Sequence, residues 1–281
     1  IKPNTIQKQF LIYNRAWAGT REYRLKFVEL LQKHNLVDDC QTSFNPVDPE
    51  HNVEYTTHIF KNIAFKPDNI QDTFPVTTAP NQSSADFTIE DYANTKFEVV
   101  LETLFDDERI QLTEKILRPI ACGHPFILAS TKGSLEYLRE YGFKTFDGII
   151  DETYDTEEDP VKRLHLIIDA MKTITTWSEE EQILNWAKIN EITKYNKQHF
   201  FSDEFANSIV NELKYNLRSA FAELEETNTG KTFFKFRKAM RKIPVLSKIR
   251  REERKTNIPA AVNMLLKARS YYKRYLKSLI A

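Results

Sequence analysis

Short apolar runs typical of buried strands alternate with helical segments over the first 175 of the 281 residues. Strands are indicated by continuous apolar or β-branched runs, and helices by apolar residues three or four positions apart. Alternation of the two predicts a parallel sheet covered by helices, so we expect an α/β, Rossmann-like domain over residues 1–175. The expected strands span 9–13, 97–102, 125–129 and 144–146, and the expected helices span 20–33, 113–122, 132–141 and 160–174.

The segment between the first helix and the second expected strand is less regular. A helix is expected over 49–63, and residues 65–84, which contain Pro, Asn, Ser and Thr without clear periodicity, are expected to form loops. From Ser178 onward strand signals vanish, so we expect a second, all-helical region over 176–281. Its expected helices span 178–198, 203–226, 231–241, 247–255 and 258–279.

The formal net charge of zero hides a strong segregation of charge. Residues 231–281 contain 16 Lys and Arg and two acidic residues, whereas the preceding residues contain 24 basic and 38 acidic ones. Such asymmetry favours either an anionic partner for this basic tail or docking of the tail on the acidic body. Within the tail, 231–242 and 271–277 interleave aromatic residues with cations, which suits an anionic membrane surface or a nucleic-acid backbone. A packed helix with a solvated basic face is the alternative.

Several classes of protein are disfavoured by what the sequence lacks. Two cysteines provide neither a disulfide framework nor a metal set, and the six histidines show no metal-ligand spacing. There is no Gly-x-Ser-x-Gly elbow, Walker loop or Gly-rich dinucleotide fingerprint, and no apolar run approaches the ~20 residues of a membrane span. We therefore expect no metal, no cofactor and a cytoplasmic protein. A peripheral membrane location, or a viral protein in a host cytoplasm, is the alternative.

The run Phe97–Glu102 leads through a polar loop into a helix that is expected to begin at Thr113. The free N–H groups of a helix start attract anions, and Lys115 adds a full positive charge that could pair with a diphosphate, while Glu114 could bind ribose hydroxyls. Ligands of parallel α/β sheets lie beyond the carboxyl ends of the strands, so polar residues after each strand should converge on one cleft. These are Asn14, Arg15, Arg21 and Arg24 after the first strand, Glu102, Arg109, Thr113, Glu114 and Lys115 after the second, and Ser130 and Lys132 after the third.

Each of these residues also has an ordinary structural interpretation. Thr-Glu-Lys at a helix start is compatible with plain surface charge, and Glu102 is equally suited to be the buried partner of an arginine. The adjacent acids Asp106, Asp107 and Glu108 invite a divalent-metal interpretation, since hard cations take oxygen ligands. Adjacent acids on an exposed loop are usually solvated, and no further ligand is placed to complete such a site.

Taken together, the runs resemble the donor-binding, C-terminal domain of GT-B glycosyltransferases, and most nearly the fucosyltransferase-like and related viral or bacterial sugar transferases. The similar runs are Phe97–Glu102, Leu112–Lys115, Arg118–Ala121, Pro125–Leu128, Gly133, Leu138–Phe146 and Ile150–Asp155, within a resemblance that covers about 9–175. The resemblance implies a metal-independent transferase that takes a nucleotide-sugar as its substrate. It places Lys115 on the diphosphate, Glu114 on the ribose, and either Arg21 or Arg24 on a phosphate.

The chain also departs from the fucosyltransferase pattern. Gln111 and Thr103 stand where that pattern has Tyr and Asn, which leaves a hexosyl or a fucosyl donor open. The second Rossmann-like domain, which in GT-B enzymes supplies much of the acceptor site, is not visible in this sequence. The competing hypothesis is therefore a non-catalytic protein that retains the fold and uses residues 231–281 to bind nucleic acid, a membrane or a protein assembly.

Overall fold

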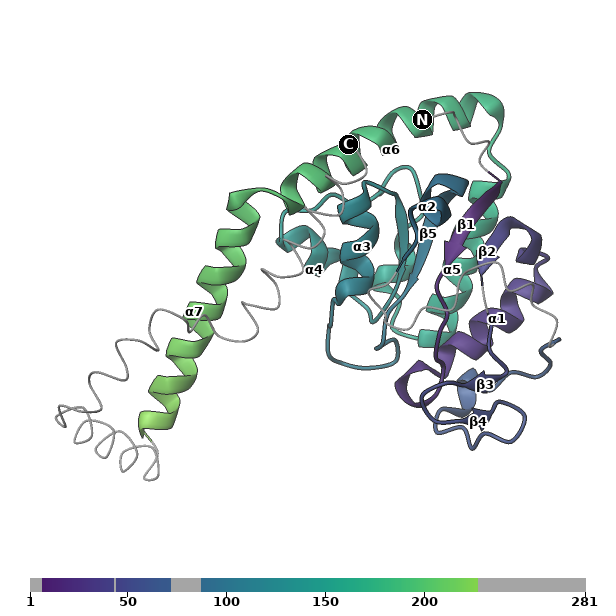
Figure 1. Cartoon of the computed structure of the whole chain (residues 1–281), viewed down its shortest axis with the longest axis horizontal. Helices are drawn as coiled ribbons and strands as arrows, with labels where there is room; N and C mark the ends of the chain where they lie inside the picture. The colour runs from purple at the N-terminus through teal and green to yellow at the C-terminus, as the bar shows by residue number, and fades with distance from the viewer. Residues whose placement is uncertain (1–6, 43, 72–86, 227–281) are drawn as a thin grey trace. The chain divides into compact units, whose positions relative to one another are not determined.

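A four-stranded, fully parallel sheet with strand order β2-β1-β5-β6 forms the centre of the computed structural model, which describes residues 7–42, 44–71 and 87–226 (Figure 1). The chain divides into two compact units, residues 1–200 and 201–281, and the sheet belongs to the first. The strands are β1 (Lys8–Ile12), β2 (Cys40–Thr42), β5 (Thr95–Leu101) and β6 (Phe126–Ala129). The predicted α/β class with a parallel sheet is confirmed.

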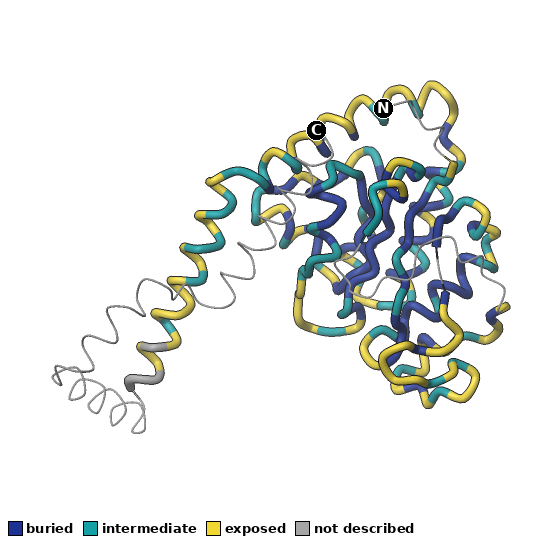
Figure 2. The backbone as a smooth tube through the Cα atoms, viewed as in Figure 1, coloured by how far each residue is buried: buried dark blue, intermediate teal, exposed yellow. Residues whose placement is uncertain are grey.

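The sheet is buried because helices flank it, and α1 packs against α5 while α3 packs against α6 (Figures 1 and 2). Strand β5, with the sequence TKFEVVL, is buried at all but one position, as expected for a central parallel strand rich in β-branched residues. The first unit contains α1 (Tyr23–Lys33), α2 (Ile89–Asn94), α3 (Glu114–Cys122), α4 (Ser134–Glu140), α5 (Pro160–Thr175) and α6 (Glu179–Phe200), with 3₁₀ turns η1 (Gly19–Arg21), η2 (Val37–Asp39), η3 (Ile63–Phe65) and η4 (Thr153–Thr156).

Helix α3, which carries the expected phosphate site, begins and ends where its sequence predicts. The Thr113 hydroxyl caps its start by accepting the N–H of Lys115 at 3.3 Å. Gly123 ends it in a left-handed conformation, with φ of 73°, and its N–H donates to the Ile120 carbonyl at 3.1 Å. The next N–H, from His124, donates to the Pro119 carbonyl at 2.9 Å, which completes a Schellman motif. The helix is nine residues long despite the internal Pro119.

The predicted helix over 49–63 is wrong, because this region forms two short antiparallel strands, β3 (Val47–Asp48) and β4 (Val53–Glu54), followed by the turn η3. The buried Asp48 carboxylate decides the outcome. It accepts the backbone N–H groups of Trp17 and Ala18 at 2.7 and 2.9 Å, and those of Glu50 and His51 at 3.0 and 2.9 Å. These bonds fix a turn where a helix would require bonds between residues four apart.

The predicted strand over 144–146 is also wrong, since only an isolated bridge between Asp147 and Ile150 is present there. Its backbone groups are bound by side chains in place of a neighbouring strand. The buried Asn196 amide accepts the N–H of Lys144 and donates to its carbonyl, both at 2.8 Å, and Glu152 accepts the N–H of Phe146 at 2.6 Å. The three-residue β2 and the six-residue α2, like β3 and β4, were not predicted.

The second unit is described only through α7 (Asp203–Glu226), which matches the helix predicted over 203–226. The helices predicted over 231–241, 247–255 and 258–279, and with them the basic tail 231–281, lie outside the described residues. Within the described part, no helix is both long and apolar enough to cross a membrane.

Candidate functional site

The order of the strands reverses direction between β1 and β5. From β1 the chain moves to β2 on one side and then crosses to β5 on the other side of β1. Loops that leave the carboxyl ends of β1 and β5 therefore diverge, which opens the crevice where open α/β sheets bind ligands. A pocket of about 270 Å³ lies there and is called the switch-point pocket. It is lined by Tyr13, Arg15, Ala16, Arg21, Arg24, Glu50, Leu101, Thr103, Gln111, Thr113, Glu114, Lys115 and Arg118.

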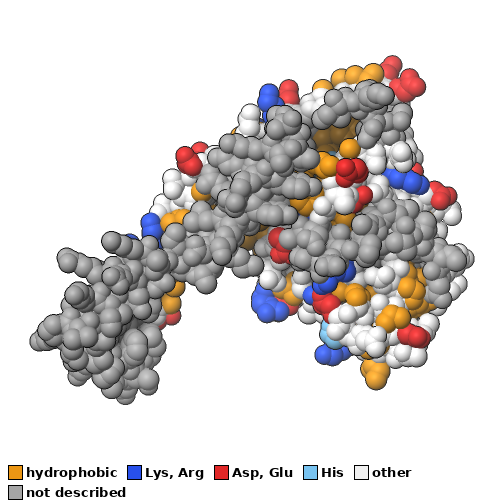
Figure 3. All heavy atoms as spheres, viewed as in Figure 1, with side chains coloured by type: hydrophobic (Ala, Val, Ile, Leu, Met, Phe, Trp, Pro, Cys, Tyr) orange, Lys and Arg blue, Asp and Glu red, His pale blue; other side chains and the backbone are white. Residues whose placement is uncertain are grey.

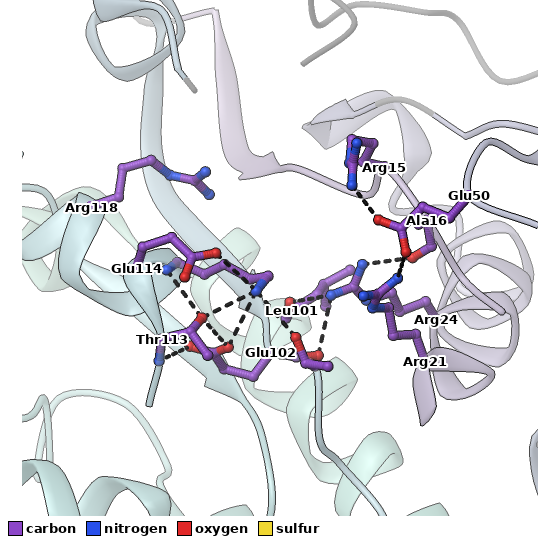
Figure 4. A network of polar contacts seen from close by, with 12 residues as sticks. Arg15, Ala16, Arg21, Arg24, Glu50, Leu101, Glu102, Thr113, Glu114 and Arg118 are labelled. Carbon is purple, nitrogen blue, oxygen red and sulfur yellow. Dashed lines mark hydrogen bonds and ion pairs between the residues drawn. The ribbon is translucent and has the colours of Figure 1, made fainter. Parts of the chain in front are cut away.

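Lys115 is held on one side of this pocket by the cap of α3. The fully buried Glu102 carboxylate accepts the N–H of Thr113 at 3.0 Å and its hydroxyl at 2.6 Å. The Lys115 ammonium lies 3.8 Å from Glu102 and donates to the hydroxyls of Thr103 and Thr113 at 3.2 and 3.1 Å, and to Glu114 at 3.3 Å (Figure 4). Glu102 thus positions the helix start and its lysine from beneath the pocket.

Arg24 is one of the two arginines expected to reach phosphate. It is buried and links the loop after β1 to the end of β5 through hydrogen bonds. Its guanidinium donates to the Ala16 carbonyl at 2.6 Å, and to the carbonyls of Leu101 and Glu102 at 2.6 and 3.2 Å. Its Nε is buried and has no hydrogen-bond partner among the described residues. The arginine therefore joins the loop after β1 to the end of β5 and places a positive charge in the wall of the pocket.

Arg15 and Arg21 lie across the pocket from Thr113 and Glu114, the two residues that precede Lys115, and share one carboxylate (Figure 4). Arg21 Nη1 donates to Glu50 Oε2 at 2.5 Å, and Arg15 donates to Glu50 Oε1. The hydrogen bond from Arg21 and the charges of both arginines lower the pKa of Glu50, although its partial burial acts in the opposite sense. Glu50 is therefore ionised at neutral pH.

Arg118 lines the pocket from α3 but is committed to a buried network. Its Nη2 pairs with the fully buried Glu98 of β5, its Nε donates to the Tyr92 hydroxyl at 3.0 Å, and Tyr92 in turn donates to Glu98. The guanidinium also lies 4.2 Å from the centre of the Tyr13 ring. Burial is the largest single influence and would lower the pKa of Arg118, but the charge and hydrogen bond of Glu98 act together with Tyr92 and Tyr13 to raise it, so the arginine stays charged.

A second pocket, of about 520 Å³, opens beside the first at the same strand ends. The two share no lining residue, but Thr20 and Leu104 of the second directly neighbour Arg21 and Thr103 of the first in the chain. It is lined by Gly19, Thr20, Glu22, Lys61, Asn62, Ile63, Phe65, Leu104, Phe105, Asp106 and Asp107. Its lining contains apolar, amide, hydroxyl and carboxylate groups and one cation, Lys61, whereas five cations line the switch-point pocket.

Five of the residues predicted from the sequence do not line either pocket: Glu102, which lies beneath the start of α3 as described above, and Ser130, Lys132, Arg109 and Asn14. Ser130 is buried and accepts the Ser134 hydroxyl at 2.9 Å, and Lys132 pairs with Glu158. Both follow β6, which is separated from β1 by β5. Arg109 pairs with Asp107 at 2.7 Å. Asn14 is 3% exposed, and neither its amide oxygen nor its amide nitrogen has a partner in the described part of the chain.

The acidic run is not arranged around a metal position. Asp107 is bound by Arg109, and Asp106 accepts the amide of Asn62. The described ranges contain no group of three or more His, Cys, Asp and Glu side chains that could hold a metal ion.

Two residues of the pocket that sequence reasoning missed are Glu50 and Tyr13. Glu50 was hidden by the wrong helix prediction, and its contacts with Arg15 and Arg21 span 35 and 29 positions. Tyr13 comes directly after β1 and before Asn14, so its position offered a usable signal.

No family model, no curated protein and no solved structure matches this chain.

Proposed function

We propose that the protein is a metal-independent glycosyltransferase of the GT-B type, which transfers a sugar from a nucleotide-sugar to an acceptor hydroxyl. One observation carries the proposal. The pocket at the reversal of strand order is lined by Lys115 at a helix start, directly after Glu114, and by Arg15 and Arg21, which lie across from Glu114 (Figure 4). Such cations and N–H groups stabilise the negative charge that develops on a departing nucleoside diphosphate.

The start of α3 offers groups for two parts of the donor. Lys115 and the N–H groups at the start of α3 would bind one phosphate, and Glu114, whose side chain is 39% exposed, would accept hydrogen bonds from ribose hydroxyls. During transfer the acceptor hydroxyl oxygen forms a bond to the anomeric carbon and gives up its proton to a base or to solvent, and the bond from that carbon to the phosphate oxygen breaks. The electron pair remains on the phosphate, where these cations neutralise it.

The size of the pocket agrees with this division. About 270 Å³ is slightly below the ~300–1,000 Å³ of complete small-molecule pockets, so it suits the charged part of a ligand better than a whole nucleotide-sugar. The neighbouring 520 Å³ pocket offers the remaining space, with amide, hydroxyl and carboxylate groups suited to a polyhydroxylated molecule.

Isothermal titration with UDP-, GDP-, ADP- and CMP-sugars tests the proposal. At least one donor should bind, and Lys115→Ala should weaken it about 10- to 100-fold, because hydrogen bonds to charged groups contribute about 1.5–3 kcal/mol. Lys132→Ala, which removes the same charge outside the pocket, should leave the affinity within about twofold. If no nucleotide-sugar binds, or if Lys115→Ala binds as the unaltered protein does, the proposal fails.

The segregation of charge favours a second candidate function, binding of an anionic surface through residues 231–281. Figure 3 shows both basic and acidic side chains of the described residues on one face of the molecule, and the sequence places the excess of cations in residues 231–281. We expect the full chain to retard duplex DNA or to sediment with anionic vesicles at low salt, and removal of 231–281 to abolish this. Unchanged migration of DNA and no sedimentation at low salt would dispose of it.

A further inference from the structure

The geometry points to two phosphate subsites in the switch-point pocket, of which the second, between Arg15 and Arg21, is occupied by the Glu50 carboxylate in the free protein. Lys115 and the start of α3 form the first. A nucleoside diphosphate engages both subsites and must displace Glu50, whereas a nucleoside monophosphate engages the first alone. This inference rests on the proposed function, because it assumes that the pocket binds phosphate, and it narrows the donor to a sugar carried on a diphosphate.

The Glu50 carboxylate is held by both arginines of the second subsite. Each oxygen of Glu50 serves one arginine: Oε2 accepts from Arg21 at 2.5 Å and Oε1 accepts from Arg15. A phosphate in the same place would also accept hydrogen bonds from the two guanidinium groups through two of its oxygens. The three side chains are between 22% and 34% exposed, so a ligand from solvent can reach them.

Glu50 belongs to a different segment of the chain from the two arginines. Unlike the arginines, it does not come from the strand-to-helix loops of the sheet, but from the turn between β3 and β4. The Asp48 carboxylate fastens this turn to the N–H groups of Trp17 and Ala18, which lie between Arg15 and Arg21 in the chain. The backbone beside Glu50 is thereby fixed to the loop that carries the arginines, so displacement requires only rotation of the Glu50 side chain.

The charges that line the pocket determine how strongly Glu50 competes with a phosphate. Five cations line the pocket, and Arg118 among them is paired with the buried Glu98. The other four, Arg15, Arg21, Arg24 and Lys115, face two negative charges, those of Glu50 and Glu114. A phosphate at the second subsite must first displace Glu50 from both arginines. Glu50 therefore competes directly with that phosphate. A phosphate bound only at Lys115 does not meet this competition.

The experiment compares diphosphates with monophosphates by isothermal titration of the full-length protein. The probes are pyrophosphate against orthophosphate, UDP against UMP, and GDP against GMP. Glu50→Gln, which keeps the shape of the side chain and removes its charge, should strengthen diphosphate binding about tenfold and leave monophosphate binding within about twofold. Arg21→Ala should weaken diphosphates alone, and Lys115→Ala should weaken both kinds of ligand.

Glu54→Gln is the matched control, because it removes the same charge from exposed β4, outside both pockets. If Glu50→Gln strengthens monophosphates and diphosphates equally, or strengthens neither, the second subsite is refuted while the proposed function stands. If none of these probes binds to any variant and no nucleotide-sugar binds either, the proposed function fails and the subsites fail with it.

Discussion

Replacement of Arg118 by methionine should lower the free energy of unfolding of the first unit by about 3–5 kcal/mol, the cost of leaving one partner of a buried ion pair uncompensated. Arg118 and Glu98 are 2% and 0% exposed and join α3 to the central strand β5. Without the guanidinium, the Glu98 carboxylate is left in the interior with the Tyr92 hydroxyl as its remaining side-chain donor among the described contacts. Urea unfolding followed by circular dichroism measures the change.

Two further variants separate charge from packing. The double variant Glu98→Gln/Arg118→Met buries no charge and should be more stable than Arg118→Met alone. Lys172→Met removes an exposed cation that pairs with Asp169 on α5, and it should change the stability by less than about 1 kcal/mol. A stability of Arg118→Met within 1 kcal/mol of the unaltered protein would contradict the role assigned to this pair.

Replacement of Arg24 by methionine should cost about 3 kcal/mol or more. Its guanidinium donates to the carbonyls of Ala16, Leu101 and Glu102, and each buried acceptor left without its donor costs about 1–3 kcal/mol. Because these carbonyls lie in the loop after β1 and at the end of β5, the variant should also lose the shape of the switch-point pocket and its ligand affinity. Thermal unfolding and titration with the donor found for the unaltered protein measure the two effects.

The lysine variant distinguishes geometry from charge at this position. Arg24→Lys keeps the positive charge but lacks the planar fork that reaches three carbonyls, so it should recover only part of the stability. Arg109→Met, which removes an exposed arginine paired with Asp107, should leave stability and affinity nearly unchanged. Full stability in Arg24→Lys would show that the charge alone matters.

The parts of the fold that were predictable are the ones determined by local physics. Strand β5 is a seven-residue segment that ends in the apolar run Val99, Val100 and Leu101, and α3 has both a capping threonine and a terminal glycine. Strand β2 is only three residues long, too short to show a period. The region 49–63 was mistaken for a helix because its structure depends on bonds from Asp48 to residues about 30 positions away.

The candidate site was predicted in part for a related reason. Residues that follow β1 and β5 could be chosen because parallel strands end at one edge of a sheet, and Arg15, Arg21 and Lys115 do line one pocket. Ser130 and Lys132 were chosen by the same rule. Without β2 the strand order could not be deduced, so neither the reversal between β1 and β5 nor the distance of β6 from it was visible.

The central place of β1 has a consequence for synthesis on the ribosome. Its residues Phe10, Leu11 and Ile12 are almost completely buried, yet β1 pairs with residues that begin at Thr95, 87 positions after Lys8. Translation at roughly 5–20 residues per second leaves this apolar strand half-paired for several seconds, and pairing over such separations is slow in itself. During that interval the nascent chain therefore exposes an apolar strand with an unpaired edge, which is the kind of segment that chaperones bind.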